Sequence, residues 1–192
     1  MRMQWKRPVW TMALASALLP AFAQTAGIDA ALLAKANAGD PAAQVQLGES
    51  YAAGTGVAQD LKLAAEWYRK AADKGDVGGE LHLAALYRDG GKGLPRDMVQ
   101  AAAWYRRAAE QGDVGAQGTL GLLYSLGQGV PQSYVEAYYW LDLAASVKGP
   151  NQEKYVANRQ MIGAHITTDE LEEVQERVAK WLAAHPRPAI SE

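Results

Sequence analysis

The stretch AAEWYRKAADKGD, residues 64–76, returns as AAAWYRRAAEQGD at residues 101–113. Nine of the thirteen letters are identical in place, and the copies start 37 residues apart. Within the first copy, Ala64, Trp67, Tyr68, Ala71 and Ala72 recur at spacings of three and four residues, which is the period of one helix face. The stretch therefore predicts an amphipathic helix that the chain builds more than once.

The repeat extends well beyond this stretch. Three leucines are spaced 36 and 37 residues apart, and three tryptophans are spaced 37 and 36 residues apart. These residues are Leu47, Leu83 and Leu120, and Trp67, Trp104 and Trp140. Ala43, Leu47 and Tyr51 fall at i, i+4 and i+8, which marks another helix before the first tryptophan helix. A period in this range is typical of stacked units, and each unit is predicted to be a helical hairpin.

Capping residues agree with this division into hairpins. Asp40 before Pro41 predicts an N-cap followed by proline at the first helical position. The segment 54–56 (GTG) breaks the first helix, and Asp60 is placed to cap the second helix. The second helices are predicted to end at a glycine, because glycine adopts the left-handed conformation most easily; these glycines are Gly75, Gly112 and Gly149.

The same set of positions recurs in three units. The first unit carries Ala43, Leu47, Gly48, Tyr51, Gly54, Gly56, Val57, Asp60, Ala64, Trp67, Tyr68, Ala71, Ala72 and Gly75. The second carries Leu83, Tyr87, Gly93, Asp97, Ala101, Trp104, Tyr105, Ala108, Ala109 and Gly112. The third carries Leu120, Gly121, Tyr124, Gly127, Gly129, Val130, Ala137, Trp140, Ala144 and Ala145. This pattern resembles the Sel1-like repeat, a relative of the tetratricopeptide repeat.

The resemblance implies a right-handed α-solenoid that holds other proteins, with no catalytic residues defined for the fold. The third unit departs from the pattern, since Ser133 replaces an aspartate, Leu141 replaces a tyrosine and SVKGP follows its end. We therefore expect an all-α chain with three repeats, at residues 40–75, 76–112 and 113–149. Alanine is abundant and valine, isoleucine and threonine are sparse, which also favours helices over sheet.

Both ends of such a stack need a cap, because a single hairpin cannot bury its two apolar faces. Residues 24–39 are expected to supply a capping helix at 28–38 that turns Ile28, Leu32 and Leu33 inward. Residues 150–184 are expected to form two helices, 151–164 and 168–184, followed by a loose tail at 185–192. Thr167 and Glu170 have the spacing of a capping box. The last helix would bury a stripe of Leu171, Val174, Val178, Trp181 and Leu182.

The first 23 residues have the layout of a secretory signal peptide. A basic start (Arg2, Lys6 and Arg7) precedes an uncharged run at 9–19, then Pro20 and the small-residue pattern AFA at 21–23. The uncharged run is too short for a bilayer, which needs about 20 apolar residues, so a lasting membrane anchor is not expected. Cleavage after residue 23 predicts an exported protein located in the periplasm.

Charge and cysteine content limit the classes of partner. The formal net charge is −2, and loss of the three basic residues at the start would bring it to −5. An acidic protein of this kind does not favour nucleic acid or an anionic membrane as its partner. The chain has no cysteine, which leaves neither a disulfide framework nor a site for a lipid on cysteine.

The sequence holds little that predicts catalysis, a cofactor or a metal. There is no cysteine nucleophile and no Gly-x-Ser-x-Gly, and the spacing of His82, His165 and His185 does not fit a zinc site. The glycine-rich loops around Lys92 lack the order of a phosphate-binding loop and are interpreted as turns. The acidic run from Asp169 to Glu173 is interpreted as the first turn of a helix, where it complements the helix dipole.

Aromatic residues leave two interpretations. Trp67, Tyr68, Trp104, Tyr105, Tyr138, Tyr139 and Trp140 would suit a platform for a sugar or peptide. Their helical spacing beside small alanines instead predicts side chains that fill the gaps between hairpins, which is the interpretation adopted here.

A partner-binding surface is predicted on the concave face, which the first helix of each hairpin lines in this kind of stack. The positions offset from the core residues are Val45, Glu49, Ala52, Leu81, Ala85, Arg88, Gly118, Leu122 and Ser125. This stripe is small and apolar in the middle, which suits a short peptide or a partner helix. Packing of Leu81 and Leu122 against neighbouring first helices is an equally open interpretation.

These observations favour a non-catalytic exported scaffold that binds a protein or peptide of the cell envelope. An alternative is an envelope hydrolase or cell-wall-binding protein, because β-lactam hydrolysis is attributed to a cysteine-rich branch of the family that this chain resembles. That branch joins each repeat with a disulfide, which this chain cannot form. Self-association through an incompletely capped end is a third hypothesis.

Overall fold

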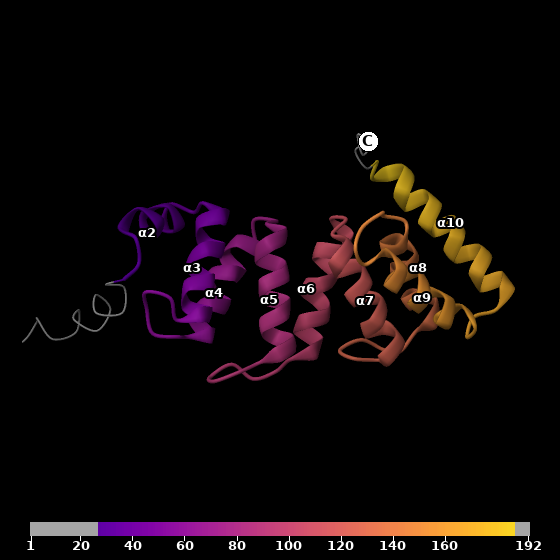
Figure 1. Cartoon of the computed structure of the whole chain (residues 1–192), viewed down its shortest axis with the longest axis horizontal. Helices are drawn as coiled ribbons and strands as arrows, with labels where there is room; N and C mark the ends of the chain where they lie inside the picture. The colour runs from indigo at the N-terminus through magenta and orange to yellow at the C-terminus, as the bar shows by residue number, and fades with distance from the viewer. Residues whose placement is uncertain (1–26, 187–192) are drawn as a thin grey trace, which may run out of the picture.

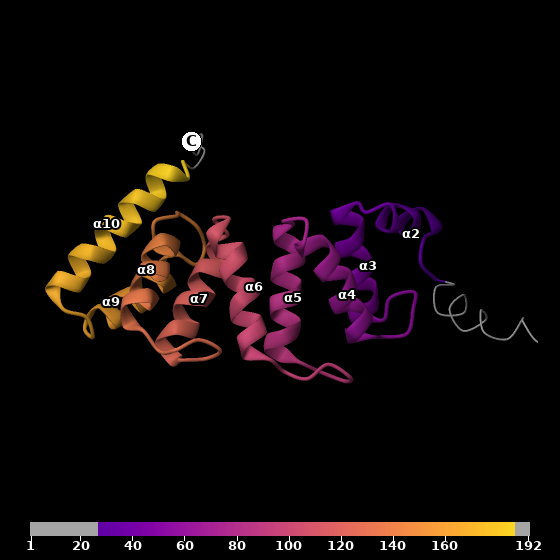
Figure 2. The same ribbon diagram turned by 180° about the vertical axis from the view of Figure 1, so that it is seen from behind.

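The computed structural model describes residues 27–186, and these residues form helices without a β-strand. Figures 1 and 2 show the helices side by side in one elongated row. The helices are α2 (Ala30–Asn37), α3 (Pro41–Ala53), α4 (Leu61–Ala72), α5 (Val77–Asp89), α6 (Met98–Glu110), α7 (Val114–Leu126), α8 (Tyr134–Ala145), α9 (Gln152–Gly163) and α10 (Thr168–Ala184). The prediction of an all-α fold of repeated helical hairpins is confirmed. The predicted signal peptide and residues 187–192 lie outside the described part of the chain.

Helices α3, α5 and α7 are the first helices of the hairpins, and α4, α6 and α8 are the second helices. Each begins at a polar cap whose side chain accepts a backbone hydrogen bond; the caps are Asp40, Asp60, Asp76, Asp97, Asp113 and Ser133. The prediction for Gly149 is wrong, because α8 already ends at Ala145 with Ser146 as its cap, and Gly149 has no positive φ. Residues 146–151 instead form a loop to α9.

Small residues let each second helix pack closely on its own first helix. A Cβ at Gly48 would lie 2.6 Å from the ring of Tyr68, and a Cβ at Gly121 would lie 2.7 Å from Cγ of Leu141. The repeated leucines, represented by Leu47, are fully buried at the centre of these pairs. Glycine at both contact positions is therefore required by the close approach of the two helices in the first and third hairpins.

Two of the three repeated tryptophans are buried, as predicted. Trp104 is 6% exposed and Trp140 is 4% exposed. Trp67 is only partly buried, so the prediction that it fills a gap in the core is incomplete. One face of its ring is covered by the Lys70 ammonium, whose Nζ lies 3.6 Å from the ring centroid.

The last turn of a helix is tied to the next hairpin by a side-chain amide at three places. The pairs are Gln44 Nε2 to Ala36 O, Gln117 Nε2 to Ala109 O and Gln152 Nε2 to Ala145 O, each at 3.1 Å. Gln44 and Gln117 are buried, so these amides satisfy carbonyl groups that water does not reach.

The junction between the first and second repeats makes this link differently. Glu80 stands where the other repeats have glutamine, and a carboxylate cannot donate to a carbonyl. Arg107 Nη2 donates to Ala72 O at 2.7 Å instead, and Arg107 Nε lies 3.0 Å from Glu80 Oε1. Gln111 Nε2 donates to Glu80 Oε2 at 2.7 Å. Burial raises the pKa of Glu80, and the positive charge of Arg107 and the hydrogen bond from Gln111 oppose that rise.

A second polar contact recurs on the outside of each junction. Arg69 of α4 donates to the hydroxyl of Tyr87 at 2.7 Å, and Arg106 of α6 donates to the hydroxyl of Tyr124. In the third repeat an aspartate, Asp142, replaces the arginine, and Arg159 of α9 pairs with it. At the two earlier junctions the arginine lies on the second helix of the preceding hairpin, whereas at the last junction it lies on the following helix, α9. The last junction therefore has the opposite polarity to the two before it.

The stack ends with α2 on one side and with α9 and α10 on the other (Figure 1). Asp29 caps α2, so this helix begins two residues later than predicted. At the other end, Thr167 and Glu170 form the predicted capping box. Helix α10 packs mainly on α8, where it buries Val174 and Val178. Its Arg177 pairs with Glu136 at 2.8 Å.

Candidate functional site

The predicted partner-binding residues of α3 differ in exposure. Glu49 is exposed, whereas Val45 and Ala52 are half-buried and pack against the core. The carboxylate of Glu49 is therefore the most accessible predicted group on this helix.

The predicted residues of α5 are all half-buried. Leu81 packs against the core, and Ala85 lies at the position of Glu49 one repeat later. Arg88 donates to both carboxylate oxygens of Asp89, from Nε at 2.8 Å and from Nη2 at 2.9 Å, and to the hydroxyl of Tyr105 at 2.9 Å. The bond to Asp89 raises the pKa of Arg88. Arg88 is thus already engaged within the chain and is not a free base for a partner.

On α7 the structure removes one predicted residue from the surface. Gly118 is buried beneath Tyr155 of α9, and a Cβ at this glycine would lie 2.2 Å from the tyrosine ring. A partner cannot touch Gly118 in this structure, because α9 covers it. Leu122 is half-exposed, and the Ser125 hydroxyl donates to the Leu122 carbonyl at 2.8 Å.

Three of the predicted positions form a row across the hairpins. Glu49, Ala85 and Leu122 are spaced 36 and 37 residues apart, so they repeat one position of the first helix. All three keep some exposure to solvent, and Leu126 at the end of α7 is 63% exposed. We call the exposed side of α3, α5 and α7 that carries this row the first-helix surface.

One cluster on the first-helix surface was missed by sequence reasoning. His82 Nε2 lies 3.2 Å from Glu49 Oε1, which joins α5 to α3. The His82 ring stacks on Tyr68, with centroids 4.9 Å apart. Burial and the Glu49 carboxylate raise the pKa of Tyr68 to about 12. The sequence held a signal for this contact. His82 occupies on α5 the repeat position that Gln46 occupies on α3, and Gln46 lies one helical turn before Glu49.

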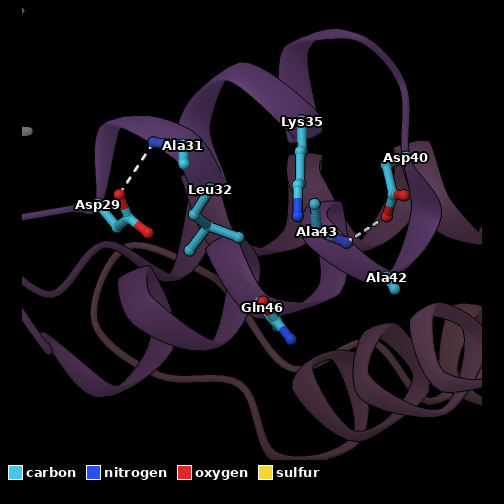
Figure 3. A pocket seen from close by; sticks show the side chains of 8 residues that line it. All are labelled: Asp29, Ala31, Leu32, Lys35, Asp40, Ala42, Ala43 and Gln46. Atoms are coloured by element: carbon cyan, nitrogen blue, oxygen red, sulfur yellow. Dashed lines mark hydrogen bonds between the residues drawn. The ribbon is translucent and has the colours of Figure 1, made fainter.

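Two adjoining hollows lie at the N-terminal end of this surface. One, of about 290 Å³, opens between α2 and α3 and is drawn in Figure 3. The other, of about 340 Å³, runs on along α3. Leu32 and Gln46 line both hollows. The remaining lining residues are Asp29, Ala31, Lys35, Asp40, Ala42 and Ala43 in the first hollow and Glu49, Ser50, Ala53 and Thr55 in the second.

A third hollow, of about 240 Å³, lies beside the loop between α8 and α9. It holds none of the predicted binding residues. Its lining is Val114, Gly115, Val147, Lys148, Gly149, Pro150, Asn151, Gln152 and Tyr155.

The two remaining histidines, His165 and His185, each stack on an aromatic ring. His165 stacks on Tyr134 with centroids 4.6 Å apart, and His185 stacks on Trp181 with centroids 4.1 Å apart. Within residues 27–186, no group of three or more histidine, aspartate or glutamate side chains is arranged to hold a metal ion. In that same part of the chain, none of the helices combines the length and the apolar character that crossing a bilayer requires.

The comparisons with known proteins match this architecture. The family model of the Sel1 repeat matches residues 41–76, 79–113 and 116–146. Among solved structures, a Sel1 repeat protein from Oxalobacter formigenes is 34% identical, with a TM-score of 0.62 over 68% of this chain and 52% of that one. No curated protein matches the chain.

A second similar structure is c5321, described as a protective antigen of uropathogenic Escherichia coli strains with an SLR fold. It is 23% identical, with a TM-score of 0.42 over 79% of this chain and 47% of that one. The chain thus spans about half the length of each of these solved proteins. Because the three family matches cover more than half of its residues, the chain belongs to the Sel1 repeat family.

Proposed function

We propose that this chain is a non-catalytic, exported scaffold that binds a protein or peptide partner on its first-helix surface in the periplasm. The Sel1 repeat fold is generally a protein-interaction scaffold. The observation that carries the proposal is the row of Glu49, Ala85 and Leu122, in which Glu49 is exposed and Ala85 and Leu122 keep partial exposure at one position of three neighbouring helices. Such a row offers a partner one continuous contact along the stack.

The chemistry of the row suits a short helix or extended peptide. Ala85 and Leu122 supply a small apolar patch, and burial of such a patch would provide most of the binding free energy. The Glu49 carboxylate at one end would set the register of the partner. Arg88, held by Asp89 and Tyr105, shapes the edge of this surface.

A single substitution on each of two faces tests the surface. Leu122→Arg places a charge in the row, whereas Val99→Arg places the same charge on α6 at a side chain that is 64% exposed. After cross-linking in intact cells, we expect the partner recovered with the wild-type chain to be lost with Leu122→Arg and kept with Val99→Arg. If both variants have native circular dichroism and recover the same partner, the first-helix surface is not the binding site.

The export part of the proposal is tested separately. Its support is the tripartite pattern of the first 23 residues. We expect the protein in the periplasmic fraction to begin at Gln24 when its mass is measured. A cytoplasmic protein that still carries residues 1–23 would contradict the proposed location without affecting the binding surface.

A further inference from the structure

The hollows between α2 and α3 lie where the repeat would place a first helix before α2, and no helix within residues 27–186 fills that position. Leu32 lies 36 residues before Tyr68, and the Tyr68 ring rests on Gly48 of its own first helix. Leu141, at the same position two repeats later, rests on Gly121 of its own first helix. Leu32 has the role of these residues in α2, but it lines the two hollows instead. By its place in the repeat, helix α2 therefore corresponds to the second helix of a hairpin.

A second residue marks the same place independently. Gln46 lies 36 residues before His82, and His82 contacts Glu49 on the first helix that precedes its own. By repetition, Gln46 on α3 faces the place of a first helix before α3. Gln46 and Leu32 line the same two hollows, and Figure 3 shows both side chains between α2 and α3. We call this combined space the vacant slot.

We propose that the vacant slot receives an amphipathic, basic helix from the partner protein, which completes the half-hairpin. The helix would place a glycine or alanine against Leu32, as Gly48 and Gly121 do against their own second helices. This inference rests on the proposed function and names the kind of partner for the N-terminal end of the first-helix surface.

Charge around the slot favours a basic partner. Asp29, Asp40 and Glu49 line it, Glu49 also lies 3.2 Å from His82 Nε2, and Lys35 is the one base among the described lining residues. Asp29 and Asp40 each use Oδ1 to cap a helix, so neither carboxylate is paired with a base by these bonds. Lysine or arginine flanking the apolar stripe of the docking helix would meet this net negative charge.

Helix α7, the first helix of the third hairpin, provides a probe. A fluorescent peptide of residues 113–127, with two lysines added at each end, carries Gly121 at the required position on a basic helix. We expect its anisotropy to rise when it is titrated with the purified protein, and added salt to weaken the binding. The same peptide with Gly121→Trp should bind at least about tenfold more weakly, because an indole does not fit against Leu32.

Variants of the protein locate the binding. Leu32→Glu and Gln46→Trp should each weaken the peptide at least about tenfold. Gln46 is exposed, so Gln46→Trp obstructs the slot without removing a core side chain. Gln160→Trp, at an exposed position of α9, is the matched control and should bind as the wild type does.

The outcomes separate this inference from the proposed function. No binding, or equal binding to the Gln46→Trp and Gln160→Trp proteins, overturns the slot. Self-association of the protein that is lost in Gln46→Trp would assign the slot to a second copy and overturn the partner assignment. Leu122 does not line the slot, so loss of the cellular partner in Leu122→Arg would still support the proposed function on its own.

Discussion

Arg107 donates a hydrogen bond from Nη2 to the carbonyl oxygen of Ala72, at 2.7 Å and across 35 residues of sequence. This contact does for the middle junction what Gln44 and Gln117 do for two others. It is needed because Glu80, the residue at the glutamine position, has no hydrogen to donate. The guanidinium also lies over the Trp104 ring, 4.5 Å from its centroid. One side chain thus joins the end of α4, the buried carboxylate and an aromatic core residue.

Glu80→Gln is expected to stabilise the fold at pH 7 by on the order of 1 kcal/mol. An amide at this position can donate to Ala72 O, and it removes a buried carboxylate. Because the pKa of Glu80 is raised in the folded state, the wild-type protein loses stability as the pH rises above the usual carboxyl pKa, which is 4.5. The advantage of the variant should therefore grow from pH 4 to pH 7 in urea unfolding. A variant less stable than the wild type at pH 7 would contradict this prediction.

Arg107→Ala is expected to destabilise the wild-type chain by about 3 to 5 kcal/mol, because it leaves Glu80 buried without its charged partner. The same substitution in the Glu80→Gln background should cost clearly less. A double-mutant cycle from chemical unfolding measures the difference, and additive effects would show that the two side chains are not coupled. Arg106→Ala, which removes a contact on the outer side of α6, serves as the control for loss of a neighbouring arginine.

Trp104→Ala should cost about 3 to 5 kcal/mol and abolish cooperative melting, since this side chain is buried between hairpins. Trp67→Ala removes the same group from a partly exposed position and should cost less. Thermal unfolding followed by near-ultraviolet circular dichroism compares the two. Equal losses of stability would contradict the prediction that the more buried tryptophan, Trp104, contributes more to the free energy of unfolding.

Gly118→Ala is expected to destabilise the chain by about 1 to 3 kcal/mol, because the new methyl group would overlap the Tyr155 ring. The matched control is Gly115→Ala in the same helix, where the nearest atom is Oδ1 of the Asp113 side chain at 3.3 Å rather than an aromatic ring at 2.2 Å. This control should be neutral or slightly stabilising, since alanine is the better helix former. Unfolding midpoints in urea would show the contrast, and a Gly118→Ala protein as stable as the control would refute the close contact.

Local signals in the sequence were sufficient for most helices and several of their caps, although not for the end of α8 or the start of α2. The Thr167 and Glu170 box and aspartate caps such as Asp40 and Asp60 act within a few residues of chain, so spacing alone reveals them. The three-fold recurrence of leucine and tryptophan then indicated which faces meet. It could not show that Trp67, near one end of the stack, has fewer neighbours than its two counterparts.

Features that depend on the ends of the stack were not predictable in this way. Gly118 matches a surface position by repetition, but Tyr155 comes from a helix outside the repeats and covers it. The vacant slot is a hollow between α2 and α3, and no residue pattern reports its volume. Comparison of the repeats shows that Glu80 stands at the position where the other two repeats have glutamine. Its compensating arginine, 27 residues later on another helix, required the structure.

The reversed polarity of the last junction fixes the order of the units. Deletion of residues 76–112 would bring Arg69 beside Tyr124, the same kind of pair that Arg106 now makes. Deletion of residues 113–149 would bring Arg106 beside Arg159, and two cations would repel each other where an ion pair now stands. The array can thus lose its middle hairpin but not its third hairpin, so its units are not interchangeable.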